Sequence, residues 1–282
     1  YQKLLKFLKI IKNYMFKKRK AKKILIMGLP GAGKTFLAKE IYKDLSAVWI
    51  NGDAIRKIYK DWDFSRKGRI RQARRLNTLS NKYINKGKNV VVDFICPNKD
   101  SFNNFKADFV VWVDTIKKGR HIRKHLDDIN PIFKKPKKFN LRVTSKDVKV
   151  WRIILLDILK KNKWDNQKPT AQMLGRFQPW HEGHRKLFEC IVKQDLQVNI
   201  QVKDVYGIDK KNPFSFVKIK KMIQKDLKLF KSRIKITKVP NITNIILGRK
   251  VGYKVNRILT PPIYRNISAT KIRKRLRKLG NI

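Results

Sequence analysis

The chain has 282 residues, 42% of them hydrophobic, so it is long enough for two domains with cores and too apolar to be disordered. Lys and Arg number 71 against 20 Asp and Glu, and the resulting net charge of +51 attracts phosphate-rich ligands and binds nucleic acid or anionic lipid non-specifically. Because this charge is spread through both halves of the chain, it names no function by itself.

The two cysteines, Cys96 and Cys190, lie far apart and lack the spacing of metal ligands. This argues against a disulfide framework or a zinc site and fits a reducing compartment, so we expect a cytoplasmic protein. No apolar run reaches the roughly 18 to 20 residues that a membrane span needs.

Residues 1–22 begin the chain with an amphipathic pattern, in which Leu4, Leu8, Ile11 and Met15 recur at helical spacing among lysines. A basic helix of this kind is suited to peripheral contact with an anionic membrane surface. It is equally suited to packing its apolar stripe on the following domain or on a second subunit. The sequence leaves these readings open, and with them a homo-oligomer.

A glycine-rich stretch follows the apolar run at 24–27 and leads into a helical pattern. It reads Gly28-Leu29-Pro30-Gly31-Ala32-Gly33-Lys34-Thr35. A strand, such a turn and a helix are typical of a P-loop, in which backbone N–H groups surround a phosphate at the helix N-terminus. Gly28, Gly31 and Gly33 shape the turn, Lys34 reaches the β- and γ-phosphates of ATP, and the Thr35 hydroxyl ligates Mg²⁺. The first half of the chain is therefore predicted to bind a nucleoside triphosphate.

Further apolar runs at 47–50, 89–93 and 109–113 alternate with helical patterns, and 139–144 could add an edge strand. Such a sequence predicts an α/β domain with a buried parallel sheet. Ligands in this class gather at the carboxyl ends of the strands, where Asp53, Arg56, Asp93, Cys96 and Asp114 fall. We expect this domain to span 23–161, closed by a helix at 146–161, with a polar linker at 162–169.

Four motifs at these strand ends resemble those of the adenylyl-sulfate kinases over roughly residues 23 to 145. They are the P-loop, Asn51-Gly52-Asp53-x-x-Arg56, Phe64-Ser65 before an Arg-rich helix, and Phe94-Ile95-Cys96-Pro97. The resemblance implies transfer of phosphate from ATP to the 3′-hydroxyl of adenylyl sulfate. It implies that Asp53 orients the acceptor hydroxyl or the Mg²⁺, and that Arg56, Arg69, Gln72 and Asp93 bind the sulfated nucleotide.

The resemblance has gaps on the acceptor side. Where the family has Asp, Glu and Asn, this chain has Gly68, Arg71 and Gln72, and the lid before Asp127 and Asp128 is short. Kinase activity is therefore a safer expectation than the acceptor's identity.

Residues 170–282 begin with a short strand and the run Gly175-Arg176-Phe177-Gln178-Pro179-Trp180-His181-Glu182-Gly183-His184. Two histidines where a strand turns into a helix lie at its positive end, where they can bind the α-phosphate of a nucleotide and stabilise the charge that develops during attack on it. A zinc pair would need four-residue spacing and a third ligand, so metal is not expected here.

This run resembles the HxGH nucleotidyltransferases, particularly the archaeal-type nicotinamide-nucleotide adenylyltransferases and the cytidylyltransferase-like proteins. The downstream run from Ile267 to Arg273 fits the same superfamily. The resemblance implies a Rossmann-like domain over roughly 170 to 279 with catalytic His181 and His184. It further implies a nucleotide site that includes Gly175 and Phe177, with Ser268, Thr270 and Arg273 on the triphosphate of ATP or CTP.

The sequence thus predicts a bifunctional transferase that acts on nucleotides and phosphorylated metabolites with Mg²⁺. A nucleic-acid end-processing kinase, a kinase for another small hydroxyl acceptor, and a membrane-surface scaffold that uses residues 1–22 stay open as alternatives. The acceptor and base preference of the second domain, channelling between the sites and the oligomeric state are also left open.

Overall fold

The computed structural model describes residues 20–119, 129–205, 208–246, 248, 252, 255, 256, 258 and 262–282. The amphipathic pattern of residues 1–19 and the lid residues Asp127 and Asp128 lie outside this part of the chain. The chain divides into two compact units, Tyr1–Val148 and Lys149–Ile282. Each unit is built on its own parallel sheet.

The first unit contains a five-stranded parallel sheet in the order β2-β3-β1-β4-β5. Its elements are β1 (Lys23–Met27), α2 (Lys34–Ile41), β2 (Val48–Asn51), α3 (Gly52–Ile58), α4 (Arg66–Asn85), β3 (Val90–Asp93), α5 (Lys99–Phe105), β4 (Phe109–Val113), α6 (Ile129–Ile132) and β5 (Leu141–Val143). The predicted parallel α/β fold is confirmed for this unit.

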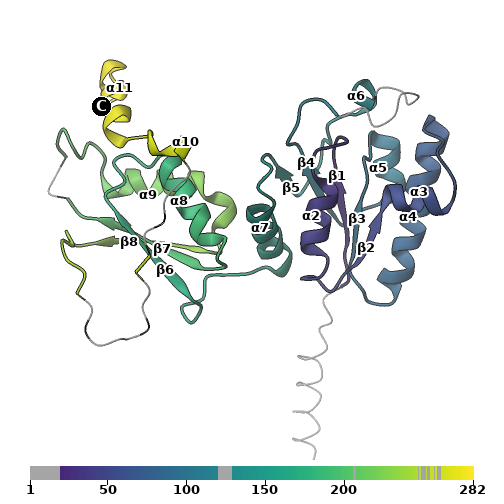
Figure 1. The fold of residues 1–282 in the computed structure, drawn as a ribbon, viewed down its shortest axis with the longest axis horizontal. Helices are drawn as coiled ribbons and strands as arrows, with labels where there is room; N and C mark the ends of the chain where they lie inside the picture. The colour runs from purple at the N-terminus through teal and green to yellow at the C-terminus, as the bar shows by residue number, and fades with distance from the viewer. Residues whose placement is uncertain are drawn as a thin grey trace, which may run out of the picture. The chain divides into compact units, whose positions relative to one another are not determined.

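Helices cover both faces of this sheet (Figure 1). On the face that α4 and α5 cover, Leu25 and Met27 of β1 share a buried cluster with Leu76 and Phe105. Successive side chains of a strand point to opposite faces, so Ile24 and the other even-numbered residue of β1 face α2. Burial on both faces explains why the strands are near-continuous apolar runs.

Side-chain caps set where several helices begin. The Asn51 side chain accepts a hydrogen bond from the Ala54 amide at the start of α3, and Ser65 does the same for Gly68 at the start of α4. In the second unit Ser215 caps α9 and Ser268 caps α11. Each oxygen satisfies an amide that has no partner within the helix, and this fixes the loop before it.

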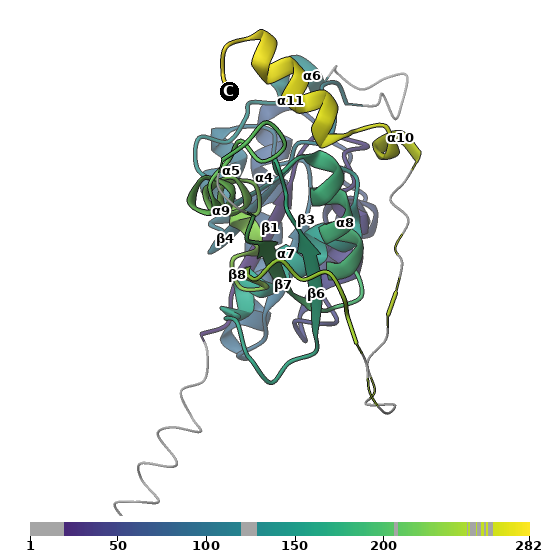
Figure 2. The same ribbon diagram turned by 90° about the vertical axis from the view of Figure 1, so that its left-hand side faces the viewer.

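The second unit has three parallel strands in the order β6-β7-β8 among the described residues. Its elements are α7 (Val148–Lys160, in this unit from Lys149), β6 (Thr170–Gly175), α8 (Glu182–Val192), β7 (Gln197–Lys203), α9 (Phe216–Asp226), a 3₁₀ turn (Lys228–Phe230), β8 (Ile234–Val239), α10 (Pro262–Arg265) and α11 (Ala269–Lys278). Phe188 of α8 meets Phe230 edge-on in the core, at 5.0 Å between ring centroids. The start of α8 lies beside α10, and a Cβ on Gly183 would be 3.7 Å from the Tyr264 carbonyl oxygen (Figures 1 and 2).

The boundary between the units differs from the one expected from the sequence. The polar run at 162–169 suggests that α7 closes the first domain, but the helix falls in the second unit. One contact ties the helix to this unit: buried Asp157 of α7 accepts hydrogen bonds from Arg233, at 2.6 Å from Nε, and from Ser232. Because its partners lie some 75 residues downstream, local composition gives no signal of this attachment.

Candidate active sites

The P-loop joins β1 to α2 through glycines in left-handed backbone conformations. Gly28 has φ +148°, and a Cβ there would lie 2.3 Å from the Val113 carbonyl oxygen. Gly33 has φ +102° and precedes α2 without a side-chain cap, so the first amides of the helix have no capping partner. Uncapped amides at the start of a helix are suited to binding phosphate. The Thr115 hydroxyl holds the outside of the loop through the Ala32 carbonyl, at 2.7 Å.

Lys34 is held inside its own loop. Its Nζ donates a hydrogen bond to the Leu29 carbonyl oxygen at 2.9 Å. Burial lowers the pKa of Lys34 to about 8, while the nearby carboxylates of Asp93 and Asp53 raise it in part. The ammonium group is therefore poorly solvated, which strengthens its attraction to a phosphate that enters the loop.

Asp93, at the end of β3, lies against the P-loop. Its carboxylate accepts hydrogen bonds from Thr35 Oγ1 at 2.7 Å, Trp49 Nε1 at 2.6 Å and Asn51 Nδ2 at 2.9 Å. The sequence assigns Asp93 to acceptor binding; the residue does not line the pocket described below. The register explains its position, because Asp93 is paired with Ile26 near the end of β1.

The pairing of Thr35 with Asp93 fits a magnesium ion. A threonine hydroxyl beside a carboxylate is a donor set that Mg²⁺ accepts when nucleotide phosphates and water complete its octahedron. In the part of the chain that the structure describes, no group of three or more His, Cys, Asp or Glu is placed to hold a metal alone. An ion at this site would therefore depend on the phosphates of the nucleotide. Asp53, the other predicted ligand, is exposed and lines the acceptor pocket.

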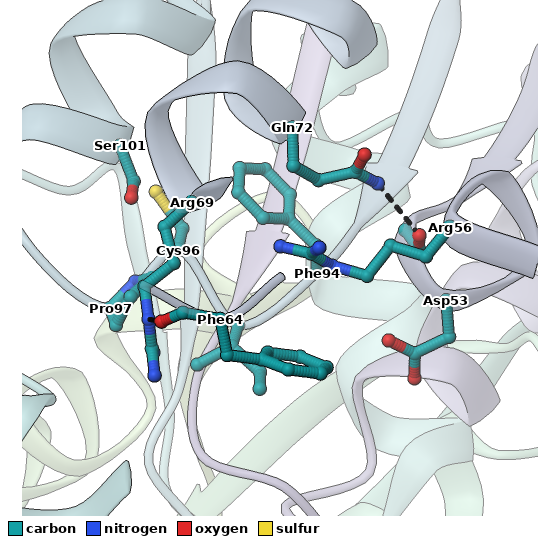
Figure 3. Close-up of a pocket in the computed structure, with 11 residues that line it drawn as sticks. Asp53, Arg56, Phe64, Arg69, Gln72, Phe94, Cys96, Pro97 and Ser101 are labelled. Carbon is teal, nitrogen blue, oxygen red and sulfur yellow. Dashed lines mark hydrogen bonds between the residues drawn. The ribbon is translucent and has the colours of Figure 1, made fainter. Parts of the chain in front are cut away.

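A pocket that is open to solvent lies beside the strand ends (Figure 3). It is lined by residues of α3, α4, α5 and the loops at 64 and 94–97, namely Gly52, Asp53, Arg56, Phe64, Arg69, Gln72, Phe94, Ile95, Cys96, Pro97 and Ser101. Two guanidinium groups, two phenyl rings and one carboxylate thus share one cavity. This combination suits an anionic, partly aromatic ligand.

Arg56 and Arg69 are both buried in the pocket wall, with 5% and 8% of their surfaces exposed. Arg56 Nη1 donates to the carbonyl oxygens of Asp61 and Asp63, each at 2.9 Å, and its guanidinium lies 4.6 Å from the centre of the Phe64 ring. Arg69 Nε donates to the Phe64 carbonyl oxygen. Burial lowers the pKa of Arg56, and the Asp61 carboxylate opposes this. Both arginines thus fix the loop that brings Phe64 to the pocket.

Gln72 also lines the pocket, as expected, but both ends of its amide have partners. Nε2 donates to the Gly52 carbonyl oxygen at 2.9 Å, and Oε1 accepts from Arg75 at 2.7 Å. These bonds join α4 to the first residue of α3. In this structure Gln72 therefore holds the pocket wall together.

Gly68, one of the departures from the resemblance, leaves room for Asp63. A Cβ at position 68 would lie 2.3 Å from Asp63 Cγ and 2.5 Å from its Oδ2. The Asp63 carboxylate accepts hydrogen bonds from the Ser65 amide and from Arg71, another departure, and these bonds lower its pKa. Arg71 also binds Asp61 at 2.8 Å. A carboxylate from the preceding loop therefore fills the space that a side chain at 68 would need.

In the second unit the two predicted histidines stack on each other. Their ring centroids are 3.7 Å apart, and both Nδ1 atoms are buried without a hydrogen-bond partner. Burial, together with the neighbouring His181, lowers the pKa of His184 to about 3, and burial lowers that of His181. Phe177 packs edge-on against His184 at 5.0 Å, and a Cβ on Gly175 would be 2.9 Å from the Phe177 ring.

The start of α11 is tied to the loop before these histidines. Arg273 Nη1 donates to the Gln178 carbonyl oxygen at 2.6 Å, and Nη2 donates to Thr270 Oγ1 at 3.2 Å. Ser268 caps the helix by accepting from the Lys271 amide at 3.2 Å. The structure therefore brings Arg273 to the histidine loop, although 95 residues separate it from Gln178.

Arg273 lies in a cationic environment. Burial lowers its pKa, and so do Arg176 and Arg277, while Asp209 raises it. Arg176 itself contacts Asn212 at 3.5 Å. Like charges gather beside the histidines with little carboxylate to balance them, which favours an anionic ligand there.

The sequence interpretation missed one residue that lines the first pocket. This is Ser101, which is not part of any recognised motif. Among the described helices, none is both long and hydrophobic enough to cross a membrane.

The matches to known proteins concern the first unit. Residues 20–141 match the family model described as adenylylsulphate kinase. No curated protein matches the chain.

Three solved structures are similar to about half of the chain. The Mycobacterium tuberculosis APS kinase CysC in complex with AMPPNP and APS is 22% identical, with a TM-score of 0.43, covering 50% of this chain and 98% of that one. A hexameric APS kinase from Thiobacillus denitrificans is 18% identical, with a TM-score of 0.38, covering 51% of this chain and 29% of that one. A shikimate kinase from Acinetobacter baumannii is 14% identical, with a TM-score of 0.37, covering 51% and 96%. The family model thus matches a range, residues 20–141, that contains the P-loop and the residues lining the pocket.

Proposed function

We propose that the first unit transfers the γ-phosphate of ATP to the 3′-hydroxyl of adenylyl sulfate. The observation that carries this proposal is the acceptor pocket, because it sets Arg56 and Arg69 beside Phe64 and Phe94, with Asp53 in the same lining. Adenylyl sulfate offers an anionic phosphosulfate for the guanidinium groups and a purine for the rings. The match of residues 20–141 to the adenylylsulphate kinase family supports the same acceptor.

In this proposal each group of residues has its own role in the phosphoryl transfer. The P-loop amides bind the ATP phosphates, and Lys34 exchanges the Leu29 carbonyl for the β- and γ-phosphates. Thr35 and Asp93 would hold Mg²⁺, which supplies positive charge that neutralises the phosphates. Asp53 accepts a hydrogen bond from the acceptor hydroxyl and orients it for in-line attack, after which ADP leaves.

The direct test incubates the purified chain with ATP and adenylyl sulfate and follows 3′-phosphoadenylyl sulfate by mass spectrometry. Parallel reactions with a 5′-hydroxyl oligonucleotide and with shikimate test the nucleic-acid and small-hydroxyl alternatives. Arg56→Ala should raise the KM for adenylyl sulfate at least about tenfold, since it removes a charge-assisted contact. Arg66→Ala, which removes an exposed arginine of the same region, should not. Phosphorylation of the oligonucleotide alone would reject adenylyl sulfate as the acceptor.

For the second unit we propose nucleotidyl transfer, in which a substrate phosphate attacks the α-phosphate of ATP or CTP and pyrophosphate leaves. The bond from Arg273 to the Gln178 carbonyl favours this activity, because it sets a cation from the start of α11 beside the histidine loop. In this proposal His181 and His184 bind the α-phosphate, and Ser268, Thr270 and Arg273 bind the rest of the triphosphate. A screen of phosphorylated metabolites with ATP or CTP, read by pyrophosphate release, identifies the acceptor. No release with any of them would overturn this part.

A further inference from the structure

Ser101 carries a buried hydroxyl group that has no partner. The residue lies in α5 and is 1% exposed. Its backbone amide donates to the Asn98 side chain at 3.0 Å, but its Oγ forms no hydrogen bond. Burying a hydroxyl without a partner costs free energy, so native proteins rarely leave one in this state without a purpose.

Buried polar atoms without a hydrogen-bond partner occur in this chain at the two candidate sites. Within the described residues, the buried side-chain polar atoms without a partner are Ser101 Oγ and the Nδ1 atoms of His181 and His184. Two of the three thus belong to the predicted histidine pair of the second unit. The third, Ser101, lines the acceptor pocket of the first unit.

Another buried serine of the same unit has a hydroxyl that does form a hydrogen bond. Ser80 of α4 is fully buried, and its hydroxyl donates to the Leu76 carbonyl oxygen at 2.7 Å. This is the usual way for a helical serine to satisfy its hydroxyl inside a core. Ser101 is the third residue of α5, so the carbonyl four residues earlier belongs to Pro97, which lies before the helix and accepts from the Lys134 amide at 2.7 Å. The chain therefore leaves the Ser101 hydroxyl without the internal partner that Ser80 has.

Ser101 lies with Cys96 and Pro97 on one side of the pocket, away from Asp53 (Figure 3). Burial raises the pKa of the Cys96 thiol, so this neighbour stays neutral and is a weak acceptor. Arg69 belongs to the same lining and gives this side of the pocket a positive charge. A serine side chain turns about a single torsion, which gives its oxygen three staggered positions.

We propose that Ser101 is an acceptor-binding residue, whose hydroxyl donates a hydrogen bond to a negatively charged oxygen of the nucleotide in this pocket. The inference rests on the proposed kinase function and adds a contact that no recognised motif supplies. The acceptor provides the hydrogen-bond partner that Ser101 Oγ lacks in the free protein. Binding therefore recovers the free energy lost by leaving the hydroxyl unpaired, and acceptors without an oxygen at this position are discriminated against.

The test compares Ser101→Ala with the wild-type chain at saturating ATP. The KM for adenylyl sulfate should rise about 10- to 150-fold, the range for one hydrogen bond to a charged group. The kcat and the KM for ATP should each stay within about twofold. The melting temperature should not fall, because alanine removes a hydroxyl that the free protein leaves unsatisfied.

The matched control is Ser80→Ala, which removes a buried hydroxyl that has an internal partner. It should lower the melting temperature and leave the KM for adenylyl sulfate unchanged. An unchanged KM in Ser101→Ala, or an equal loss of ATP affinity and of stability, would overturn the role of Ser101 while the kinase activity stands. A wild-type chain that does not phosphorylate adenylyl sulfate would overturn the proposed kinase function, and this inference with it.

Discussion

Both candidate sites are built where a parallel strand runs through a loop into a helix, but they satisfy their polar groups differently. In the first, Lys34 Nζ bonds to the Leu29 carbonyl and the Thr35 hydroxyl bonds to Asp93. In the second, the Nδ1 atoms of His181 and His184 have no partner. The P-loop must therefore exchange bonds when a nucleotide arrives, whereas the histidine pair only gains them.

This difference shows what each site requires of its ligand. In the proposed kinase reaction the phosphates of ATP would compete with the carbonyl that holds Lys34, so only a strongly anionic group would displace it. Burial lowers the pKa of both histidines, so in the proposed nucleotidyl transfer they would offer hydrogen bonds without a formal charge. The first site would thus select for charge at binding, and the second for charge that develops during the reaction.

The largest expected effects are losses of one activity at a time, when a central residue of one site is replaced. Lys34→Ala should reduce phosphoryl transfer at least about 1000-fold, because it removes the cation that faces the transferred phosphate. His184→Ala should reduce pyrophosphate release about 100-fold or more. Each variant should keep the other activity, and both are measured on the same purified chain.

The controls lie on the same helices. Lys39→Ala removes the side-chain charge of an exposed lysine of α2, and Cys190→Ala removes the free thiol of a cysteine of α8. Both should retain both activities. If Lys34→Ala also abolished pyrophosphate release in a folded protein, the independence of the two sites would be refuted.

A smaller effect tests how tightly the P-loop is built. Gly28→Ala should destabilise the first unit by about 3 kcal/mol, since its Cβ would meet the Val113 carbonyl in addition to the strain of a positive φ. Gly33→Ala has open space around its Cβ and should cost only about 1 to 2 kcal/mol from backbone strain. Urea unfolding measures both free energies. Equal losses would mean that Val113 moves away without cost.

Stability should also depend on pH. The pKa of His184 is about 3 when folded and 6.5 in the unfolded reference, so between these values the unfolded state binds more protons. Stability should therefore fall as pH decreases from 6.5 towards 3, by at most about 1.4 kcal/mol per pH unit for this group. His184→Gln should flatten that part of the profile.

Lys34 of the first site should change the stability of the protein over a different pH range. For Lys34, with a pKa of about 8 against 10.5, stability should rise as the pH increases from 8 to 10.5. Lys34→Met should remove this rise. Urea midpoints across both pH ranges measure the two effects, and coincident windows would contradict the burial assigned to either group.

Much of the first unit was predictable from local patterns. Apolar runs gave the strands, and the glycine spacing gave the P-loop, since both depend on neighbours in the chain. The place of Arg56 beside the first site follows from its position after a strand end, whereas Arg69 was expected only from the resemblance. Asp93 lies at the strand end next to the P-loop, as expected, and its assignment to acceptor binding stays a prediction. Only the order of strands shows that β3 lies next to β1.

The other differences depend on distant contacts. The attachment of α7 to the second unit depends on Arg233, far along the chain from Asp157. Ser101 could not be singled out from the sequence, because a hydroxyl without a partner is visible only when all its neighbours are known. The pairing of Arg273 with the histidine loop was the exception, since two motifs in order implied it.

The exchange of space between Asp63 and Gly68 also constrains how this chain can change. A Cβ at 68 would lie 2.3 Å from the Asp63 carboxylate carbon and 2.4 Å from the Asp63 backbone carbonyl oxygen. A smaller residue at 63 would therefore remove only part of the clash, and a side chain at 68 also requires the backbone at 63 to move. Any engineering that restores an acid at 68 has to begin in the preceding loop.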